Sequence, residues 1–150
     1  MALLVNNIGE AEMLERILGI HSNTGTAGDT LCLRLFDNDL TPEEGDSFDS
    51  FTESDYGGGD SIKVLAGDTE QDAADTHWNI VTGAGDTTWA VYGQQTFSFD
   101  SGDTIFGYYV TTVTKDGDTI VAWSEKFTDG PYTIPAQGGT INITPRVELE

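Results

Sequence analysis

The chain has 150 residues, a length that fits one domain with its own hydrophobic core, and its 7 Phe, 5 Tyr and 3 Trp residues favour a packed interior. The 26 acidic residues against 6 basic ones give a formal net charge of −20, which excludes nucleic acid and anionic membrane surfaces as partners, because both repel a polyanion. Salt screens such self-repulsion, so the acid excess favours a protein made for a high-salt setting, with an ordinary acidic surface as the alternative.

The first twenty residues predict an apolar arm and one helix. Ala2–Val5 is apolar, and apolar residues recur at spacings of three and four over Gly9–Ile20, which is typical of an amphipathic helix. The arm lacks the basic region of a signal peptide, and no segment is long enough to span a membrane, so we expect synthesis in a cytoplasm without a secretion signal. The apolar content exceeds what an exposed tail needs, which makes this region a candidate partner-binding surface; a helix that simply caps the protein's own core is the alternative. The candidate contact residues are Leu3, Leu4, Val5, Ile8, Met13, Leu14, Ile17 and Leu18.

From residue 31 onward the sequence predicts strands and turns. The candidate strands are rich in Val, Ile, Thr and aromatic residues, and Leu31, Leu33 and Leu35 alternate as on one buried face. The predicted strands are Leu31–Phe36, Ser61–Ala66, Thr76–Val81, Thr88–Tyr92, Gln95–Phe99, Ile105–Thr114, Thr119–Phe127 and Thr140–Leu149.

Turn signals between these strands point to an all-β fold. The tripeptide Gly-Asp-Thr occurs five times at irregular spacing and is interpreted as a turn, in which Gly permits positive φ and Thr begins the next strand. Asp116-Gly117 indicates a hairpin. We therefore predict an antiparallel β-sandwich of jelly-roll type with one N-terminal α-helix. It would form a single domain over residues 1–150, with the arm and helix in 1–20 and the sandwich in 31–150.

Residues 37–60 form a long acidic connection, which we expect to hold a short turn of helix near Phe51–Asp55. A connection of this length inside a compact domain is usually functional or in contact with a partner. Asp37-Asn38-Asp39 resembles the start of a calcium loop, but Pro42 stands where an EF-hand requires Gly. We expect weak, nonspecific cation association there and no dedicated metal site.

Motifs that carry catalysis are not found in the sequence. It contains neither a phosphate-binding Gly-rich loop ending in Lys-Ser/Thr nor a nucleophile elbow. The one cysteine, Cys32, lies in an apolar run and is interpreted as a buried structural thiol. Two histidines far apart do not make a zinc site, and among 26 carboxylates chance pairs carry no signal for glycoside hydrolysis. We therefore expect neither an enzyme nor a cofactor.

Six stretches, in order along nearly the whole chain, carry a resemblance to a known group of proteins. They are Val5–Glu10 leading into Met13-Leu14, Leu33–Pro42, Phe51–Tyr56, Tyr92–Phe97, Gly107–Val110 and Trp123–Tyr132. In these stretches the chain resembles the small structural proteins of tailed viruses of bacteria and archaea. The resemblance implies a capsid decoration, or cement, protein that sits on the outside of the shell as a homotrimer and binds the major capsid protein. The extreme acidity departs from the family and fits a virus of a salt-loving host.

Two other functions remain open from the sequence. One is a tail- or fibre-associated virion protein that contacts the host surface. The other is a secreted carbohydrate-binding module or hydrolase, which the missing signal peptide disfavours. Whether it is a decoration protein or a tail- or fibre-associated protein, we expect it to be made in the host cytoplasm and to become part of the virion.

Overall fold

A computed structural model describes residues 31–56, 62–65, 78–82, 88–113 and 118–149. Over these residues the protein is all-β, as predicted, with antiparallel pairing throughout and one short 3-10 helix. The strands are β1 (Leu31–Phe36), β2 (Lys63–Leu65), β3 (Trp78–Thr82), β4 (Thr88–Tyr92), β5 (Gln95–Phe99), β6 (Asp103–Ile105), β7 (Gly107–Val113), β8 (Thr119–Lys126), β9 (Tyr132–Ile134), β10 (Gly139–Ile143) and β11 (Arg146–Leu149), and the helix is η1 (Phe48–Ser50). The predicted arm and helix, residues 1–20, lie outside the described residues.

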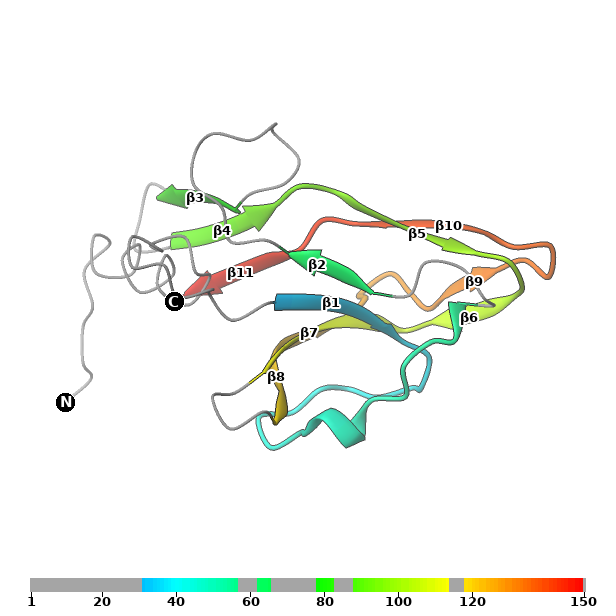
Figure 1. Ribbon diagram of the computed structural model, residues 1–150, viewed down its shortest axis with the longest axis horizontal. Coiled ribbons are helices and arrows are strands. Elements are labelled where there is room, and N and C mark those ends of the chain that lie inside the picture. Colours follow the sequence, from blue (N-terminus) through cyan, green and yellow to red (C-terminus); the bar gives the residue numbers. More distant parts are fainter. Residues whose placement is uncertain (1–30, 57–61, 66–77, 83–87, 114–117, 150) are drawn as a thin grey trace. The chain divides into compact units, whose positions relative to one another are not determined.

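The described elements belong to two compact units. The larger contains β1, η1, the first two residues of β2, and β5 to β10. Its main sheet has the order β2-β1-β7-β8, and the pairs β10-β5 and β6-β9 form two further sheets, which can be followed in Figure 1. The smaller unit contains the sheet β11-β4-β3. The prediction of one domain over 1–150 stays a prediction.

The centre of the main sheet is the pair β1 and β7. Leu31, Leu33 and Leu35 are buried, while Cys32 and Arg34 on the opposite face are half-buried. The predicted alternation is therefore confirmed, but Cys32 is less buried than expected. Burying a leucine side chain stabilises the fold by roughly 1.5–3 kcal/mol, so this face alone contributes substantially to holding β1 in register.

Two long predicted strands are each divided in the structure. The predicted Ile105–Thr114 is split at Phe106, whose N–H donates to the Phe36 carbonyl (3.0 Å). Next to it, a Cβ on Gly107 would lie 2.1 Å from the Glu125 carbonyl oxygen, so only glycine permits this close approach. The predicted Thr140–Leu149 is split before β11 at Pro145, which has no N–H for a ladder.

The smaller unit is built around β4, which lies between β11 and β3. Thr88, Ala90 and Tyr92 are buried in strict alternation, and the Tyr92 ring meets the Trp78 ring edge-on at 5.2 Å. On the other side of β4, the Arg146 guanidinium lies 5.0 Å from the Trp89 ring centroid. Aromatic contacts of this kind add to the burial energy of the small sheet.

Candidate functional site

The acidic connection after β1 is a closed loop, which we call the anchored loop (residues 37–56). At its base, the Asp37 N–H donates to the Thr52 carbonyl at 3.0 Å. The Asn38 amide joins the same two ends, because its Nδ2 donates to the Ser50 carbonyl (3.0 Å) and its Oδ1 accepts from the Thr52 N–H (3.0 Å). The loop's one turn of helix, η1, begins at Phe48, slightly before the predicted position. A segment rich in like charges is thus held by its own hydrogen bonds.

The residues that resemble a calcium loop serve this closure. Asn38 is used as described, and the Asp39 carboxylate pairs with Lys126 Nζ of β8 at 2.5 Å. Within the described ranges, no group of three or more His, Cys, Asp or Glu side chains is arranged to hold a metal ion. The expectation that no dedicated metal site lies here stays a prediction for the chain as a whole.

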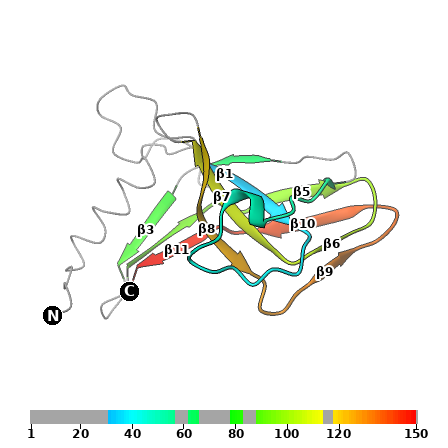
Figure 2. The ribbon, with the colours of Figure 1, turned by 90° about the horizontal axis from the view of Figure 1, so that it is seen from below.

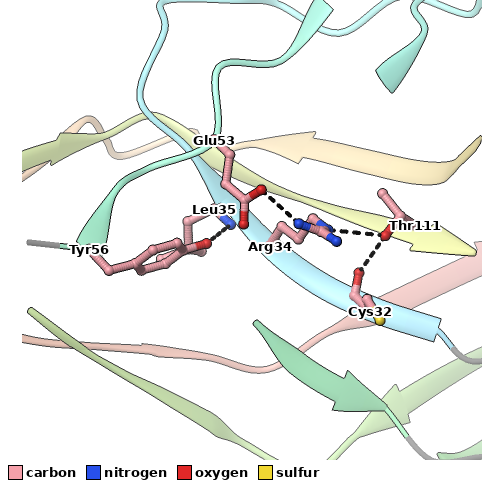
Figure 3. Close-up of polar contacts among 6 residues, drawn as sticks. All are labelled: Cys32, Arg34, Leu35, Glu53, Tyr56 and Thr111. Atoms are coloured by element: carbon pink, nitrogen blue, oxygen red, sulfur yellow. Dashed lines mark hydrogen bonds and ion pairs between the residues drawn. The ribbon is translucent and has the colours of Figure 1, made fainter. Parts of the chain in front are cut away.

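A half-buried ion pair fastens the far end of the anchored loop to the sheet. Arg34 Nη1 of β1 lies 2.7 Å from Glu53 Oε2, and these side chains are 17% and 28% exposed. The Arg34 Nε also donates to Thr111 Oγ1 of β7 (3.2 Å), whose hydroxyl donates in turn to the Cys32 carbonyl (3.4 Å), as Figure 3 shows. A guanidinium with two directed contacts is held in one orientation, which fixes Glu53 against the sheet.

The loop ends on a buried tyrosine. The Tyr56 hydroxyl accepts a hydrogen bond from the Leu35 N–H at 2.9 Å (Figure 3), and the ring stacks on Phe97 of β5 at 5.7 Å. Burial raises the pKa of this phenol well above its usual value. The backbone of Tyr56 has φ 53°, a strained conformation for a bulky residue that persists only because these contacts hold it.

Beneath the loop lies an aromatic cluster, which we call the Tyr109 cluster (Phe36, Phe51 and Tyr109). The rings of Phe51 and Tyr109 stack at 4.7 Å and those of Phe36 and Phe51 meet edge-on at 5.3 Å. The Tyr109 side chain is fully buried, and its hydroxyl has no hydrogen-bond partner among the residues described. Burial, aided by the charge of Glu53, raises the pKa of this phenol. The cluster supports Phe51, which faces the feature described next.

A hollow of about 350 Å³ opens between the anchored loop and β8. Its rim is a tight turn, in which the Glu43 N–H donates to Asp46 Oδ2 (2.7 Å) and the Asp46 N–H donates to the Glu43 carbonyl (3.0 Å). Phe51 contributes an apolar wall. Figures 1 and 2 show the loop passing beside β7 and β8. The lining residues are Pro42, Glu43, Glu44, Asp46, Phe51, Val121, Ala122, Trp123 and Ser124.

The opposite wall contains a β-bulge of β8. Val110 pairs with Trp123 and Thr111 pairs with Val121, so Ala122 has no partner across the ladder. Cross-strand partners share a face of the sheet, so Val121 and Ser124, opposite Thr111 and Tyr109, lie on the face of the Tyr109 cluster. Trp123, opposite Val110, lies on the other face. The bulge adds one residue, Ala122, to this wall.

The hollow combines a charged rim with apolar lining. The Glu43 and Glu44 side chains are exposed on its rim, and neither has a basic partner within the described part of the chain. The Asp46 carboxylate accepts the hydrogen bond from the Glu43 N–H in the turn. Below the rim, Phe51 and Val121 supply aromatic and apolar surface. Such a combination favours a positive charge on an apolar stem.

A second group of carboxylates lies at the base of the anchored loop. Ser54 Oγ donates to Asp103 Oδ2 at 2.5 Å. Burial raises the pKa of Asp37, and the negative charges of Asp103 and Asp55 raise it further. These groups belong to the closure of the loop and not to the hollow.

The sequence did not identify this hollow. The eight residues proposed for partner binding, from Leu3 to Leu18, lie outside the described residues, so that hypothesis stays a prediction. The length and acidity of the 37–60 connection did point to its neighbourhood. The pairing of that loop with residues 121–124 had no sequence signal, because it depends on a bulge and on contacts across the fold.

Comparison of the chain with protein-family models, with curated proteins and with solved structures finds no match. Over the residues that the structure describes, no helix has the length and apolarity needed to cross a membrane.

Proposed function

We propose that this protein is a virion structural protein that decorates the outside of a tailed-virus capsid, where it binds the major capsid protein and bridges neighbouring capsomers without catalysis. The observation that carries the proposal is the anchored loop: a long acidic surface segment that is closed on itself, fastened to the sheet by Arg34 and Glu53, and shaped into a hollow. A rigid surface of this kind loses little conformational entropy when it binds another protein.

The viral assignment rests on the resemblance described above. Two of the resembling stretches, Leu33–Pro42 and Phe51–Tyr56, contribute the two ends of the anchored loop, and a third, Trp123–Tyr132, begins in the wall of the hollow. A shell under pressure from packed DNA gains from clamps between capsomers. A homotrimer is a closed cyclic assembly that matches a local three-fold axis of such a shell.

The proposal includes a finer architecture. The antiparallel sheets would pack as a jelly-roll-like sandwich, and Gly9–Ile20 would form an α-helix that, with the Ala2–Val5 arm, contacts the shell. The apolar stripe of the helix sequence supports this. Deleting residues 1–20 tests the contact: reduced occupancy on particles supports it, and unchanged occupancy contradicts it.

The decisive experiment is a count of copies in purified particles. Quantitative mass spectrometry should find the chain at a fixed ratio comparable to the major capsid protein, and cryo-electron microscopy should place it on the outer shell at three-fold positions. A few copies per particle would replace the proposal with its alternative, a tail- or fibre-associated protein that contacts the host surface. Absence from particles would overturn both.

Adaptation to high salt is a separate part of the proposal. The charge of −20 is carried by a chain of 150 residues. The Debye length, beyond which salt largely screens repulsion between charges, falls from about 10 Å at 0.1 M to about 3 Å at 1 M. The Tm, followed by circular dichroism, should therefore rise steadily from dilute buffer to molar KCl. A Tm that does not change with KCl would contradict the high-salt setting.

A further inference from the structure

We propose that the hollow between the anchored loop and β8 receives a basic side chain, arginine or lysine, of the partner protein. The inference rests on the proposed function for the identity of the partner, the capsid protein, but the binding chemistry follows from the hollow itself.

The lining selects a cation that carries an apolar stem. A lysine or arginine places its aliphatic chain on apolar surface and its charged head at a polar rim. Phe51 and Val121 provide the apolar surface here, and Glu43 and Glu44 provide rim carboxylates that have no basic partner among the described residues. The Phe51 ring in the same hollow adds attraction for a cationic head group.

Other occupants fit less well. An anion, such as a phosphate or a carboxylate, is repelled by the rim. A bare metal ion prefers several converging oxygen ligands, whereas Phe51 and Val121 contribute apolar surface here and the Asp46 carboxylate is committed to the Glu43 N–H. A purely apolar side chain would leave the rim charges facing one another without a counter-charge.

The hollow is built to keep its shape when empty. On the loop side, the turn is closed by two reciprocal hydrogen bonds between Glu43 and Asp46. On the strand side, Lys126 holds Asp39 at 2.5 Å and Thr41 at 3.4 Å, which fixes the loop to β8. Phe51 is held by its stack on Tyr109. A preformed receptor spends less of its binding energy on ordering itself.

The test uses single side chains as probes. The full-length ¹⁵N-labelled protein is titrated with N-acetyl-arginine methylamide, N-acetyl-lysine methylamide and the neutral isostere N-acetyl-citrulline methylamide. The expected result is a saturable shift of the amides of residues 43–46 and 121–124, with a Kd on the order of 1 mM for at least one cationic probe. The citrulline probe should give no saturable shift. Shifts scattered over the surface, or equal for citrulline, would overturn the inference.

Variants separate the hollow from general acidity. Because a single exposed ion pair contributes little, both rim carboxylates are removed together. Glu43→Gln/Glu44→Gln should weaken binding of the cationic probe by at least about fivefold. Asp100→Asn/Asp129→Asn is the matched control, because it removes two exposed carboxylates of the same unit that do not line the hollow. Equal weakening by both double variants would contradict the inference. Ala122→Leu keeps the charge and fills the hollow, so it should abolish the saturable shift, and retained binding would also contradict it.

A particle-binding experiment distinguishes this inference from the proposed function. If the wild-type protein binds capsids and Glu43→Gln/Glu44→Gln lowers its occupancy more than the control pair does, both are supported. If the wild type binds and the variant binds equally, the hollow is not the capsid contact and the inference fails while the proposed function stands. If the wild type does not bind capsids, the proposed function fails, and the capsid protein is no longer the partner whatever the probes show.

Discussion

Tyr56 and Tyr109 lie in two aromatic clusters of the larger unit and use their hydroxyls differently. In the Tyr56 cluster (Tyr56, Phe97 and Phe99), the phenol accepts the Leu35 N–H. In the Tyr109 cluster, the phenol has no hydrogen-bond partner among the described residues. Both rings are almost completely buried. The comparison separates two tasks of a buried tyrosine: the first satisfies a backbone group and fixes the loop's end, and the second supplies ring area beneath the hollow.

The largest difference between the clusters should come from truncating one phenylalanine in each. Phe97 is fully buried and Phe51 is 7% exposed at the hollow. Phe97→Ala should cost about 3–5 kcal/mol of unfolding free energy, because it leaves a closed cavity. Phe51→Ala should cost less, about 2–3 kcal/mol, because its cavity merges with the hollow and admits water. Urea denaturation measures both.

A milder pair guards against variants that fail to fold. Phe97→Leu and Phe51→Leu remove less volume and should keep the same order of cost. If Phe51 proves the costlier position in both pairs, the hollow is not open to solvent as described, and the ranking of the two clusters is reversed.

The next effect comes from the ion pair beside the Tyr109 cluster. Arg34→Gln should cost about 1–3 kcal/mol, less than for a fully buried pair, because the two side chains are 17% and 28% exposed. It leaves Glu53 without its counter-charge and Thr111 without its donor. Denaturation of the single and double variants with Glu53→Gln gives the coupling. The double variant should be more stable than Arg34→Gln alone; additive losses would show that the pair does not fasten the loop.

The two hydroxyls give the most direct test of the comparison. Tyr56→Phe should cost about 1–3 kcal/mol, because the Leu35 N–H is left buried without an acceptor. Tyr109→Phe should change the unfolding free energy by less than about 0.5 kcal/mol, or stabilise the protein, because no hydrogen bond to a described residue is lost. Equal costs at both positions would mean that Tyr109 has a partner outside the described residues or an ordered water.

Several elements of the fold were predictable from local pattern alone. The bounds of β1, β4 and β5 agree with the prediction, because each strand alternates buried and less buried residues between clear turns. The hairpin partners β7 and β8 were also expected, and they pair in the structure. Where local pattern and burial agree, the sequence is sufficient.

The features that the sequence did not predict depend on contacts between residues that are distant in sequence or on patterns too short to recognise. The break at Phe106 depends on contacts with Phe36 and Glu125, which are distant in sequence. The short strand β9 has only one buried residue, Ile134, and so carries almost no alternation. The bulge at Ala122 lies in the wall of the hollow, and nothing in the residues Val121 to Ser124 distinguishes a bulged strand from a regular one. The helical turn was expected after Phe51 but lies before it, where the loop folds onto the Tyr109 cluster.

The smallest expected effect concerns Asp37, at the base of the loop that joins the two clusters. Its pKa is raised above the usual 3.8 by burial and by Asp103 and Asp55, so the folded state binds a proton at a higher pH than the unfolded state does. Above the raised pKa, the charged carboxylate opposes folding. As pH falls through that pKa, the folded state takes up the proton first, and this opposition is relieved, fully so below 3.8.

Asp37→Asn should therefore stabilise the protein at pH 7, by about 0.5 kcal/mol or a rise in Tm of about 1–2 °C. The advantage over wild type should shrink as pH falls toward 3.8, because the wild-type carboxyl becomes neutral as well. Unfolding free energies at a series of pH values measure this difference, in which the titration of all other carboxylates cancels. Asp49→Asn, an exposed position of the same loop, reports the effect of removing one charge in general. An advantage at pH 7 that persists unchanged at low pH, or that Asp49→Asn reproduces, would show that the stabilisation does not come from removing the buried Asp37 charge.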